Sequence, residues 1–420
     1  MQIRSFGLTL VAGAALLLSA CTSTGGSPAA SVAPDPCAGA KAGAAHTPPT
    51  DWTKAKIGVV TDIGTLNDKN FNEYSFKGAQ DGATAIKAAA PQSVVPKDQS
   101  EYMKVIGTYV DQGYDIIVTV GFNLATPTAC MAKANSGVWF VGVDQSPICV
   151  TADGKPDTTF ACKGDAKTLL PKYISLAFKE DQAGYLAGIV AASISKNAEI
   201  GAIGGTTLCA PCVRYIQGYE LGAKSVNSAI SVKTAYVTRD FSAKAFQDQT
   251  GGKAFADNFL TTNPKVDVLF QVAGLTGNGV LDSACARNIY GIGVDVDQFL
   301  SYPNADKCLV TSAEKHLQTA VSDAITAIGG GSAKPGDNTF DATNNGIGVA
   351  DFHDKKSLIS ADVQKKLDDA LAAMKAGTLT TCPTTGCGVG PKWSPAEAVL
   401  NGPAGDGRPV SFIGRIGARR

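Results

Sequence analysis

The chain alternates short runs of β-branched and aliphatic residues with amphipathic helical patterns, and this order occurs twice. A first series extends from about residue 56 to residue 195, and a second series of matching order begins at about residue 199. Strands that alternate with helices pair in parallel, because each connecting helix returns the chain to the same end of the sheet. The pattern therefore predicts an α/β protein with two lobes, each built on a doubly wound parallel sheet.

The expected elements have similar lengths in the two halves. The predicted strands are residues 56–61, 93–96, 115–120 and 138–143 in the first half, and 199–204, 232–237, 267–272 and 290–294 in the second. The predicted helices are residues 71–90, 102–110, a helix that contains Met131, 180–195, 213–225, 244–260 and 277–286. Roughly 320 residues exceed one typical domain, which also favours two lobes. In such sheets ligands bind beyond the carboxyl ends of the strands.

The N-terminus has the pattern of a lipoprotein signal peptide. Arg4 precedes an uncharged apolar run from Leu8 to Leu18, and Leu18-Ser-Ala-Cys21 resembles a bacterial lipobox. The run is shorter than the ~20 apolar residues that a membrane-spanning helix needs. We therefore expect a signal peptide over residues 1–20, and acyl chains such as palmitate that anchor Cys21 to the extracytoplasmic face of the cell membrane. The alternative is an ordinary signal peptide with a Cys at this position by chance.

Composition predicts two segments outside the lobes. Residues 21–51 are rich in Ala, Gly, Ser, Pro and Thr, so they are expected to form a flexible tether, with folded sequence beginning near Trp52. Residues 378–420 are a Gly- and Pro-rich extension that is either disordered or packed across a lobe.

The cysteine content agrees with an exported protein. The chain has 11 Cys, so ten remain if Cys21 carries lipid, and an even number outside the cytoplasm suggests up to five disulfides. Sequence alone does not fix the pairing, although near neighbours favour Cys149–Cys162, Cys209–Cys212, Cys285–Cys308 and Cys382–Cys387, which would leave Cys37–Cys130. Cys209-Ala-Pro-Cys212 also has redox spacing, but export favours a structural bridge. With one Cys-x-x-Cys and three scattered His residues, no metal site is predicted.

The balanced charge of the chain gives no indication of a nucleic-acid partner. Lys and Arg together number 37, as do Asp and Glu, and the sequence has no clustered basic face of the kind that nucleic-acid-binding proteins carry.

Polar and aromatic side chains follow the predicted strands of both halves. The candidate ligand-binding residues are Asp62, Phe71, Phe122, Asp144, Gly274, Asp295 and Lys315. Carboxylates accept pairs of hydroxyl hydrogen bonds, as sugars require. Aromatic faces stack on a flat or apolar ring, and glycine lets the backbone approach a ligand. Together these residue types suit a polyol that carries an aromatic group.

Each candidate also has a structural alternative. Asp62 or Asp144 could cap the helix that follows it. Phe71 could pack into the core. Lys315 could lie on a solvated face or belong to an ion pair.

Signals of catalysis and of phosphate binding are weak. The glycines at 204–205 and 274–277 match neither the dinucleotide fingerprint nor the P-loop. The chain has no Gly-x-Ser-x-Gly elbow, and His46, His316 and His353 are not near a candidate nucleophile in the sequence. We therefore expect a binding protein with no catalytic residues and no cofactor. A secreted nucleoside hydrolase is the alternative enzyme, because a carboxylate cluster could cleave N-glycosidic bonds.

Six motifs in the same order resemble the basic membrane protein family, the purine nucleoside receptor-like substrate-binding lipoproteins of ABC transporters. They are residues 62–72 (DIGTLNDKNFN), 178–192 (FKEDQAGYLAGIVAA), 203–205 (IGG), 218–224 (GYELGAK), 273–280 (AGLTGNGV) and 292–298 (IGVDVDQ). The resemblance covers about residues 56–377. It implies the hinged, ribose-binding-like fold of type I periplasmic binding proteins. The lobes would be residues 52–178 with a return of about 312–330, and residues 179–311 with about 331–377.

The resemblance also implies roles for the candidate residues. Asp62 and Phe71 would hold the base, Asp144 would contribute to the pocket, Asp295 and Lys315 would contact ribose hydroxyls, and Gly274 would bring backbone to the ligand. Phe122 matches less securely. The resemblance does not place the second stacking aromatic, for which Tyr215 and Phe241 are candidates. The implied partners are a nucleoside, with purines favoured, and the permease and ATPase of an ABC transporter. A receptor for a sugar or another small polar ligand, with transport or with signalling, is the alternative binding function.

Overall fold

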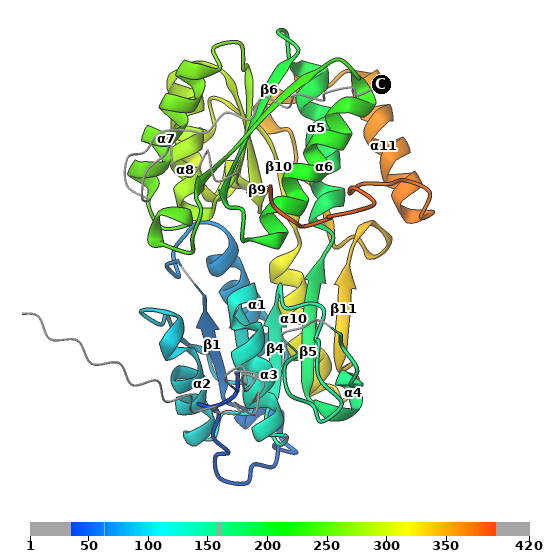
Figure 1. Cartoon of the computed structure of the whole chain (residues 1–420). Helices are drawn as coiled ribbons and strands as arrows, with labels where there is room; N and C mark the ends of the chain where they lie inside the picture. Colours follow the sequence, from blue (N-terminus) through cyan, green and yellow to red (C-terminus); the bar gives the residue numbers. More distant parts are fainter. Residues whose placement is uncertain (1–34, 63, 158–160, 392–420) are drawn as a thin grey trace, which may run out of the picture. The chain divides into compact units, whose positions relative to one another are not determined.

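The computed structural model describes residues 35–62, 64–157 and 161–391, and contains two parallel α/β lobes (Figure 1). The sheet of the N-terminal lobe has the strand order β2 (Gln92–Val94), β1 (Ile57–Thr61), β3 (Ile116–Val120), β4 (Trp139–Val143), β5 (Tyr173–Phe178) and β11 (Gly336–Phe340), and all its pairings are parallel. Its helices are α1 (Phe71–Ala85), α2 (Tyr102–Asp111), α3 (Ala125–Ala134), α4 (Ala166–Leu169) and α10 (Leu317–Gly329).

The C-terminal lobe repeats this plan. Its sheet has the strand order β7 (Ser231–Thr238), β6 (Glu199–Thr206), β8 (Val268–Val272), β9 (Tyr290–Asp295), β10 (Leu309–Lys315) and β12 (Ile347–Val349), where β12 pairs antiparallel with β10. Its helices are α5 (Glu180–Ile194), α6 (Ala210–Val226), α7 (Gln249–Thr262), α8 (Gly274–Ala286), α9 (Gln298–Ser301) and α11 (Ala361–Lys375). The predicted two-lobed parallel fold is confirmed.

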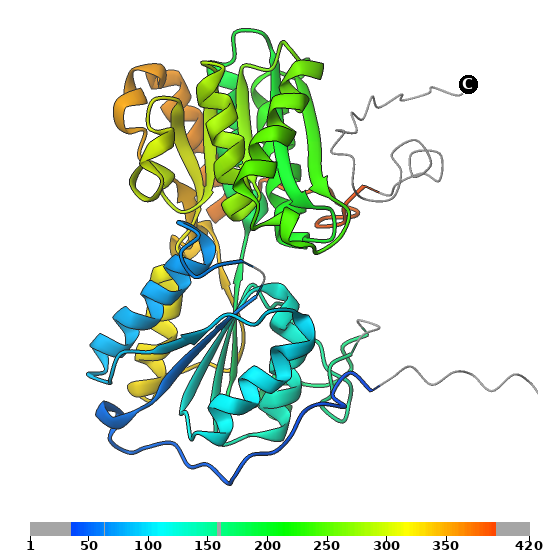
Figure 2. The same cartoon turned by 90° about the vertical axis from the view of Figure 1, so that its left-hand side faces the viewer.

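Buried β-branched runs explain why each sheet is covered on both faces. Successive residues of a strand point to opposite faces. Accordingly, Val59 packs in the cluster that includes α1 and α10, whereas Val60 packs with residues of α2 and α3 on the other side. Figure 2 shows helices on both sides of the N-terminal sheet. A strand that is apolar on both faces belongs in such a covered parallel sheet.

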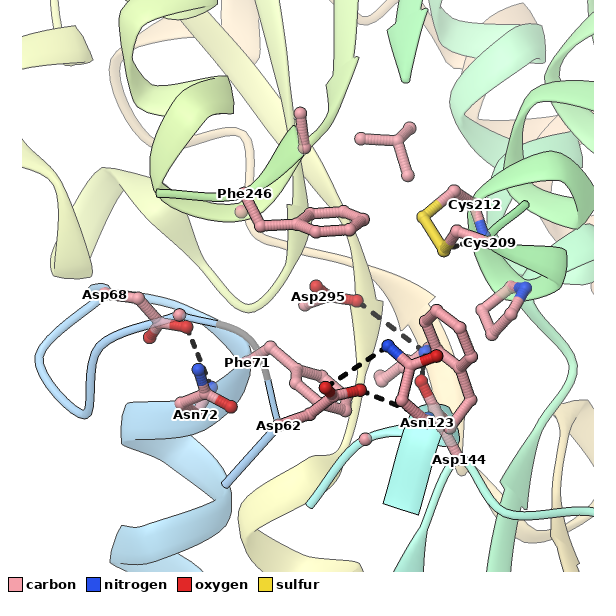
Figure 3. Close-up of a pocket in the computed structure, with 18 of the residues that line it drawn as sticks. Asp62, Asp68, Phe71, Asn72, Asn123, Asp144, Cys209, Cys212, Phe246 and Asp295 are labelled. Carbon is pink, nitrogen blue, oxygen red and sulfur yellow. Dashed lines mark hydrogen bonds and ion pairs between the residues drawn. A yellow bond between two sulfur atoms is a disulfide. The ribbon is translucent and has the colours of Figure 1, made fainter. Parts of the chain in front are cut away.

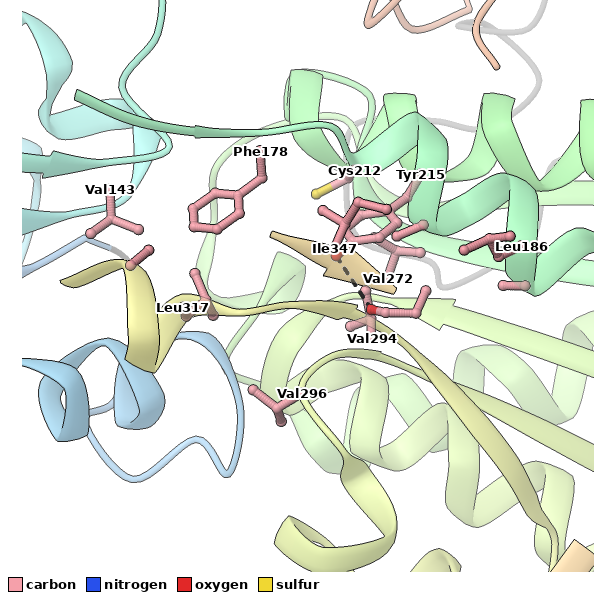
Figure 4. Packing of buried hydrophobic residues seen from close by; sticks show 14 of the residues in the cluster. Val143, Phe178, Leu186, Cys212, Tyr215, Val272, Val294, Val296, Leu317 and Ile347 are labelled. Carbon is pink, nitrogen blue, oxygen red and sulfur yellow. Dashed lines mark hydrogen bonds between the residues drawn. The ribbon is translucent and has the colours of Figure 1, made fainter. Parts of the chain in front are cut away.

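Three crossing segments join the lobes. The chain passes from β5 to α5 at Lys179, from β10 to α10 at His316, and from β11 to β12 through residues 341–346. Backbone hydrogen bonds tie the segments together, because Lys179 N donates to Phe340 O (3.0 Å) and His316 N donates to Gly346 O (3.0 Å). One apolar cluster includes Val143 and Phe178 from the N-terminal sheet and Val294 and Ile347 from the C-terminal sheet (Figure 4). The lobes therefore share a packed, multi-stranded hinge.

The crossing points differ from those that the sequence implied. Residues 312–315 belong to the C-terminal sheet through β10, and β11 belongs to the N-terminal sheet, because it pairs in register with β5. The expected return of about 312–330 to the N-terminal lobe therefore holds for α10, which packs on α1, but not for the end of β10. The expected assignment of residues 331–377 to the C-terminal lobe fails for β11. Its sequence, GDNTF, has no apolar run that would identify a strand.

The second half of the expected tether packs on the N-terminal lobe. All five favoured cysteine pairs are present, and Cys37–Cys130 attaches this segment to α3. Gly43 N donates to Asn135 Oδ1 (2.8 Å), and Asn135 Nδ2 donates to Lys41 O (3.1 Å). The prediction of a flexible tether over residues 21–51 is therefore wrong for residues 37–46, whereas residues 21–34 lie outside the described part of the chain.

The first part of the C-terminal extension also packs on its lobe. Gln217 of α6 donates to Gly386 O (3.1 Å) and accepts from Gly388 N (2.8 Å), and Thr381 donates to Asp181 of α5. Residues 392–420 lie outside the described residues. None of the helices in the described ranges is long and apolar enough to span a membrane.

The disulfide that attaches the N-terminal segment should contribute more to the stability of the fold than the short C-terminal disulfide. The Cys37–Cys130 bridge closes a separation of 93 residues, and the Cys382–Cys387 bridge closes one of 5. Because loop-closure entropy grows with loop length, the double variant Cys37→Ser/Cys130→Ser should lose about 4 kcal/mol of unfolding free energy, and Cys382→Ser/Cys387→Ser about 2 kcal/mol. Denaturant unfolding measures both losses. Equal losses, or no new protease cleavage within residues 36–50 of the first variant, would contradict this account.

Candidate functional site

A cavity lies where the carboxyl ends of both sheets meet. It is lined by residues that follow β1, β3 and β4 of the N-terminal lobe, and by residues of the C-terminal lobe at β8, β9, β10 and the start of α6 (Figure 3). All seven residues predicted for the site line it: Asp62, Phe71, Phe122, Asp144, Gly274, Asp295 and Lys315. Parallel strands bring these positions together, because their carboxyl ends lie at one edge of each sheet.

Asp62 is held in a fixed orientation at the end of β1. It accepts hydrogen bonds from Tyr102 Oη, from Asn123 N (3.1 Å) and from Asn123 Nδ2 (3.2 Å). Burial and the Asp62 charge raise the pKa of Tyr102. Asp62 therefore orients the side-chain amide of Asn123, another cavity residue, and the N-cap position of α1 belongs to Asn70 and not to Asp62.

Asp68 has the capping role that the sequence allowed for Asp62. Its carboxylate accepts from Asn70 N (2.9 Å), Asn72 N (2.9 Å) and Glu73 N (3.1 Å) at the start of α1. Burial nevertheless raises its pKa to about 6. Asp68 also lines the cavity, and Asn278 of α8 donates to its carbonyl oxygen across the lobes (3.4 Å).

Asp144 and Asp295 occupy matching positions in the two lobes. Asp144 directly follows β4, and Asp295 is the last residue of β9. Their φ angles are +59° and +65°, a left-handed conformation that non-glycine residues rarely adopt. Strained backbone of this kind concentrates at functional sites, where the surrounding structure maintains it.

Lys315 joins these carboxylates in a buried ion cluster. Its Nζ lies 2.6 Å from Asp144 Oδ2, 3.1 Å from Glu180 Oε1 and 3.9 Å from Asp295 Oδ1, and its side chain is 2% exposed. Arg214 Nε lies 2.6 Å from Glu180 Oε2. Because an isolated buried charge is very costly, each of these groups depends on the others. Lys315 is therefore not on a solvated face.

Burial and the neighbouring charges shift the pKa values of this cluster in opposite directions. Desolvation raises the pKa of Asp144 and of Asp295 to about 6, with Lys315 opposing the shift and Glu180 adding to it. Burial would raise the pKa of Glu180 too, but Lys315 and Arg214 outweigh it and lower that pKa. The charges of Asp144 and Glu180 keep the pKa of Lys315 raised despite its burial. The cluster therefore has carboxylates that take up protons just below neutral pH.

Aromatic rings lie on both sides of the cavity. Phe71, at the first turn of α1, and Phe246, in the loop between β7 and α7, lie on opposite sides of it in Figure 3. Tyr215 is fully buried and donates to Asp295 Oδ1 (3.2 Å) or Ala313 O (3.3 Å). Phe241 packs on Phe122 with a ring distance of 5.4 Å and does not line the cavity. Phe246 is thus the ring opposite Phe71. Of the two candidates from the sequence, Tyr215 also lines the cavity and Phe241 does not.

Several lining residues were missed from the sequence. They are Asp68, Asn72, Asn123, Phe246 and the Cys209–Cys212 disulfide at the start of α6. Phe246 falls within the helix that the sequence predicted over residues 244–260, whereas α7 begins at Gln249 and leaves Phe246 in the loop after β7. Asn123 stands beside Phe122 and was open to the same reasoning. Nothing in the spacing of Cys209 and Cys212 showed that this disulfide forms a cavity wall.

None of the three His residues lines the cavity. His46 lies 2.9 Å from Asp115, His353 lies 2.7 Å from Asp297, and His316 lies 3.9 Å from Glu314. Within the described residues, no group of three or more His, Cys, Asp or Glu side chains is placed to hold a metal ion.

Two hinged α/β lobes with a ligand cavity at their strand ends define a substrate-binding protein of the periplasmic type. The chain belongs to the family of PnrA-like ABC transporter substrate-binding proteins, whose profile matches residues 54–378. Members of this family bind substrate outside the cytoplasm for an ABC transporter, so the protein is a binding protein and not an enzyme.

Known proteins agree with this assignment. The ABC transporter nucleoside-binding protein BmpA of Lactococcus lactis subsp. cremoris is 31% identical over 288 residues, which are 64% of this chain and 74% of that protein. Basic membrane protein A of Borreliella burgdorferi is 27% identical over 324 residues, or 75% of this chain and 84% of that protein. The crystal structure of an ABC transporter solute-binding protein from Aeropyrum pernix shares the fold, with a TM-score of 0.64 and 22% identity over 78% of this chain and 92% of that one.

The buried cluster makes stability depend on Lys315. Lys315→Met leaves three buried carboxylates without their shared cation and should cost about 3–5 kcal/mol of unfolding free energy at pH 8. The loss should be smaller at pH 5, because carboxylates with a raised pKa are then protonated and neutral. Urea unfolding at the two pH values measures both effects. Lys233→Met, which removes a half-exposed lysine 3.7 Å from Glu199, is the control. A loss for Lys315→Met that is the same at both pH values would contradict the assignment.

Proposed function

We propose that the protein captures a nucleoside between its lobes and delivers it to an ABC permease. The observation that carries the proposal is the pair of rings, Phe71 and Phe246, on opposite sides of a cavity that four aspartates also line (Figure 3). Rings on two sides suit a flat nucleobase, which can stack on both. The nucleoside-binding name of the Lactococcus relative supports the same ligand class.

Hydrogen-bond acceptors dominate the polar part of the cavity. Asp62, Asp68, Asp144 and Asp295 line it, whereas Lys315 is its one lining lysine or arginine among the described residues. Asp144 Oδ1 and Asn72 Oδ1 are buried without a hydrogen-bond partner. A ligand with hydroxyl and N–H donors would satisfy these acceptors, and ribose hydroxyls at Asp295 are the simplest match. A phosphate group would instead meet like charge, so the proposed ligand is a nucleoside and not a nucleotide.

The pair of rings, Phe71 and Phe246, also favours a nucleoside over the alternative ligand, a free sugar. The hydroxyls of a free sugar would also bind the carboxylates, but a sugar ring has only small apolar faces with which to stack on aromatic rings. In the proposed arrangement the base occupies the space between the rings, and the ribose lies toward Asp295 and Lys315. Purines are favoured because a larger ring system covers more of both aromatic faces.

Binding to nucleosides tests the proposal directly. Calorimetry of ligand-stripped protein should detect a purine nucleoside, with weaker binding of the free base and of the 5′-monophosphate. Hydrogen bonds to a charged group contribute about 1.5–3 kcal/mol, so Asp295→Ala should weaken binding roughly 10- to 150-fold. Phe71→Ala and Phe246→Ala should each weaken it by a similar order, since each removes about 1–3 kcal/mol of stacking.

Asp257→Ala is the matched control, because Asp257 lies on α7 and does not line the cavity. The proposal would be defeated if no nucleoside bound the wild-type protein. It would also be defeated if a sugar bound more tightly than every nucleoside tested.

We further propose that lipid on Cys21 holds the protein at the membrane. Cys21 lies outside the described residues, and the support is the lipobox-like sequence that ends at it. In Cys21→Ser, labelled fatty acid should no longer enter the protein, and the protein should stay unprocessed or be released. Equal labelling of the variant and the wild type would exclude this anchor.

A further inference from the structure

Glu180 is a fully buried carboxylate whose burial the ligand site does not explain. It opens α5 directly after the first crossing segment, its side chain is fully buried, and it does not line the cavity. A carboxylate is not buried without compensation, and Glu180 has two cationic partners. Arg214 Nε lies 2.6 Å from one oxygen, and Lys315 Nζ lies 3.1 Å from the other.

Glu180 thereby fixes the position of Lys315. The ammonium of Lys315 donates to Asp144 of the N-terminal lobe at 2.6 Å, and on the other side it forms an ion pair with Glu180 at 3.1 Å. Asp295 Oδ1 is farther away, at 3.9 Å. The rings of Phe71, Phe178 and Tyr215 surround the ammonium, with centroids 5.3–5.6 Å away. Lys315 is therefore held between two carboxylates, and Asp295 keeps acceptor capacity for a ligand.

We infer that Glu180, braced by Arg214, is a positioning residue of the binding site. It holds Lys315 between the lobes and sets the charge state of the two ligand-facing carboxylates, Asp144 and Asp295, without touching the ligand. Glu180 and Lys315 lie beside two different crossing segments, so the contact between them also joins two of the three hinge connections. The inference rests on the proposed function only for the choice of ligand in the binding test.

The charge balance explains how Glu180 can act at a distance. With three carboxylates and two cations, the cluster of Asp144, Glu180, Asp295, Lys315 and Arg214 has one excess negative charge when all are ionised. The other titratable or charged groups that act on its members are Asp68, Asp181 and Tyr215. The Glu180 charge contributes to the raised pKa of both Asp144 and Asp295. Removing it should let these two carboxylates stay ionised at lower pH.

The variant Glu180→Gln keeps the shape of the side chain and removes its charge. In wild type, nucleoside affinity should fall as the pH drops below about 6, because a protonated carboxyl accepts hydrogen bonds less well. In Glu180→Gln the midpoint of that fall should move about half a pH unit or more to lower pH, and affinity at pH 7.5 should weaken about 10-fold because Lys315 loses one carboxylate. Glu180→Asp, which retains the charge, should keep the wild-type midpoint even where its affinity is lower.

Glu199→Gln is the matched control. It makes the same charge change in the same lobe, at the start of β6, where Glu199 lies 3.7 Å from Lys233 and does not line the cavity. Its midpoint should equal that of wild type. A midpoint that is unchanged in Glu180→Gln, or one that moves equally in Glu199→Gln, would overturn the inference.

Unfolding of the ligand-free protein tests the same inference without any ligand. Groups whose folded pKa is raised stabilise the fold at low pH, and this contribution is lost as the pH rises from about 4 through about 6. Between about pH 5 and pH 7, where Glu180 is ionised in both the folded and the unfolded wild-type protein, Glu180→Gln should lose less stability than wild type or Glu199→Gln. Equal pH dependence in all three would overturn the positioning role. Failure of every nucleoside to bind would instead overturn the proposed ligand and leave this titration to decide the role of Glu180.

Discussion

The contact between Lys315 and the carboxylates around it is the interaction on which the site depends. A lysine that is 2% exposed can stay charged only beside anions, and the anions can stay charged only beside it. Because Asp144 belongs to one lobe and Glu180 and Asp295 to the other, the cluster forms only when the lobes are held together as the structure shows. The electrostatics of the cavity therefore depend on the geometry of the hinge.

The repeated lobe architecture explains how that cluster arises. Each sheet delivers its fourth predicted strand to the same edge, so Asp144 and Asp295 face a common space from opposite lobes. Both residues have left-handed backbone conformations, and both have a pKa raised to about 6 by burial. A left-handed backbone conformation at a non-glycine residue costs free energy, which the surrounding structure must offset. A ligand with hydroxyl donors would offset part of that cost.

Much of this arrangement could be predicted from the sequence, for a physical reason. Buried parallel strands are recognisable as apolar runs, and the residue after each run must lie at the ligand edge, so Asp62, Asp144 and Asp295 were found without a structure. Phe246 was missed because the helical pattern predicted over residues 244–260 includes it, whereas α7 begins at Gln249 and leaves Phe246 in the loop that lines the cavity.

Other features left too little signal in the sequence. Glu180 begins an apolar helix, and its role is visible only from its contacts with Arg214 and Lys315, which lie 34 and 135 positions later in the sequence. β11 is polar and short, so periodicity could not assign it to a lobe. Residues 37–46 read as a tether by composition, but the bridge to Cys130 holds them on the lobe. In each case a long-range contact outweighed the local pattern.

The central claim is that the cavity holds one neutral nucleoside between Phe71 and Phe246. Native mass spectrometry of the protein purified without denaturation from cells that express it tests this claim most directly. The account predicts a protein whose excess mass equals one nucleoside, and whose released ligand has the mass and fragments of a base joined to an unphosphorylated ribose. A released ligand that proves to be a free sugar, an amino acid or a nucleotide would contradict it.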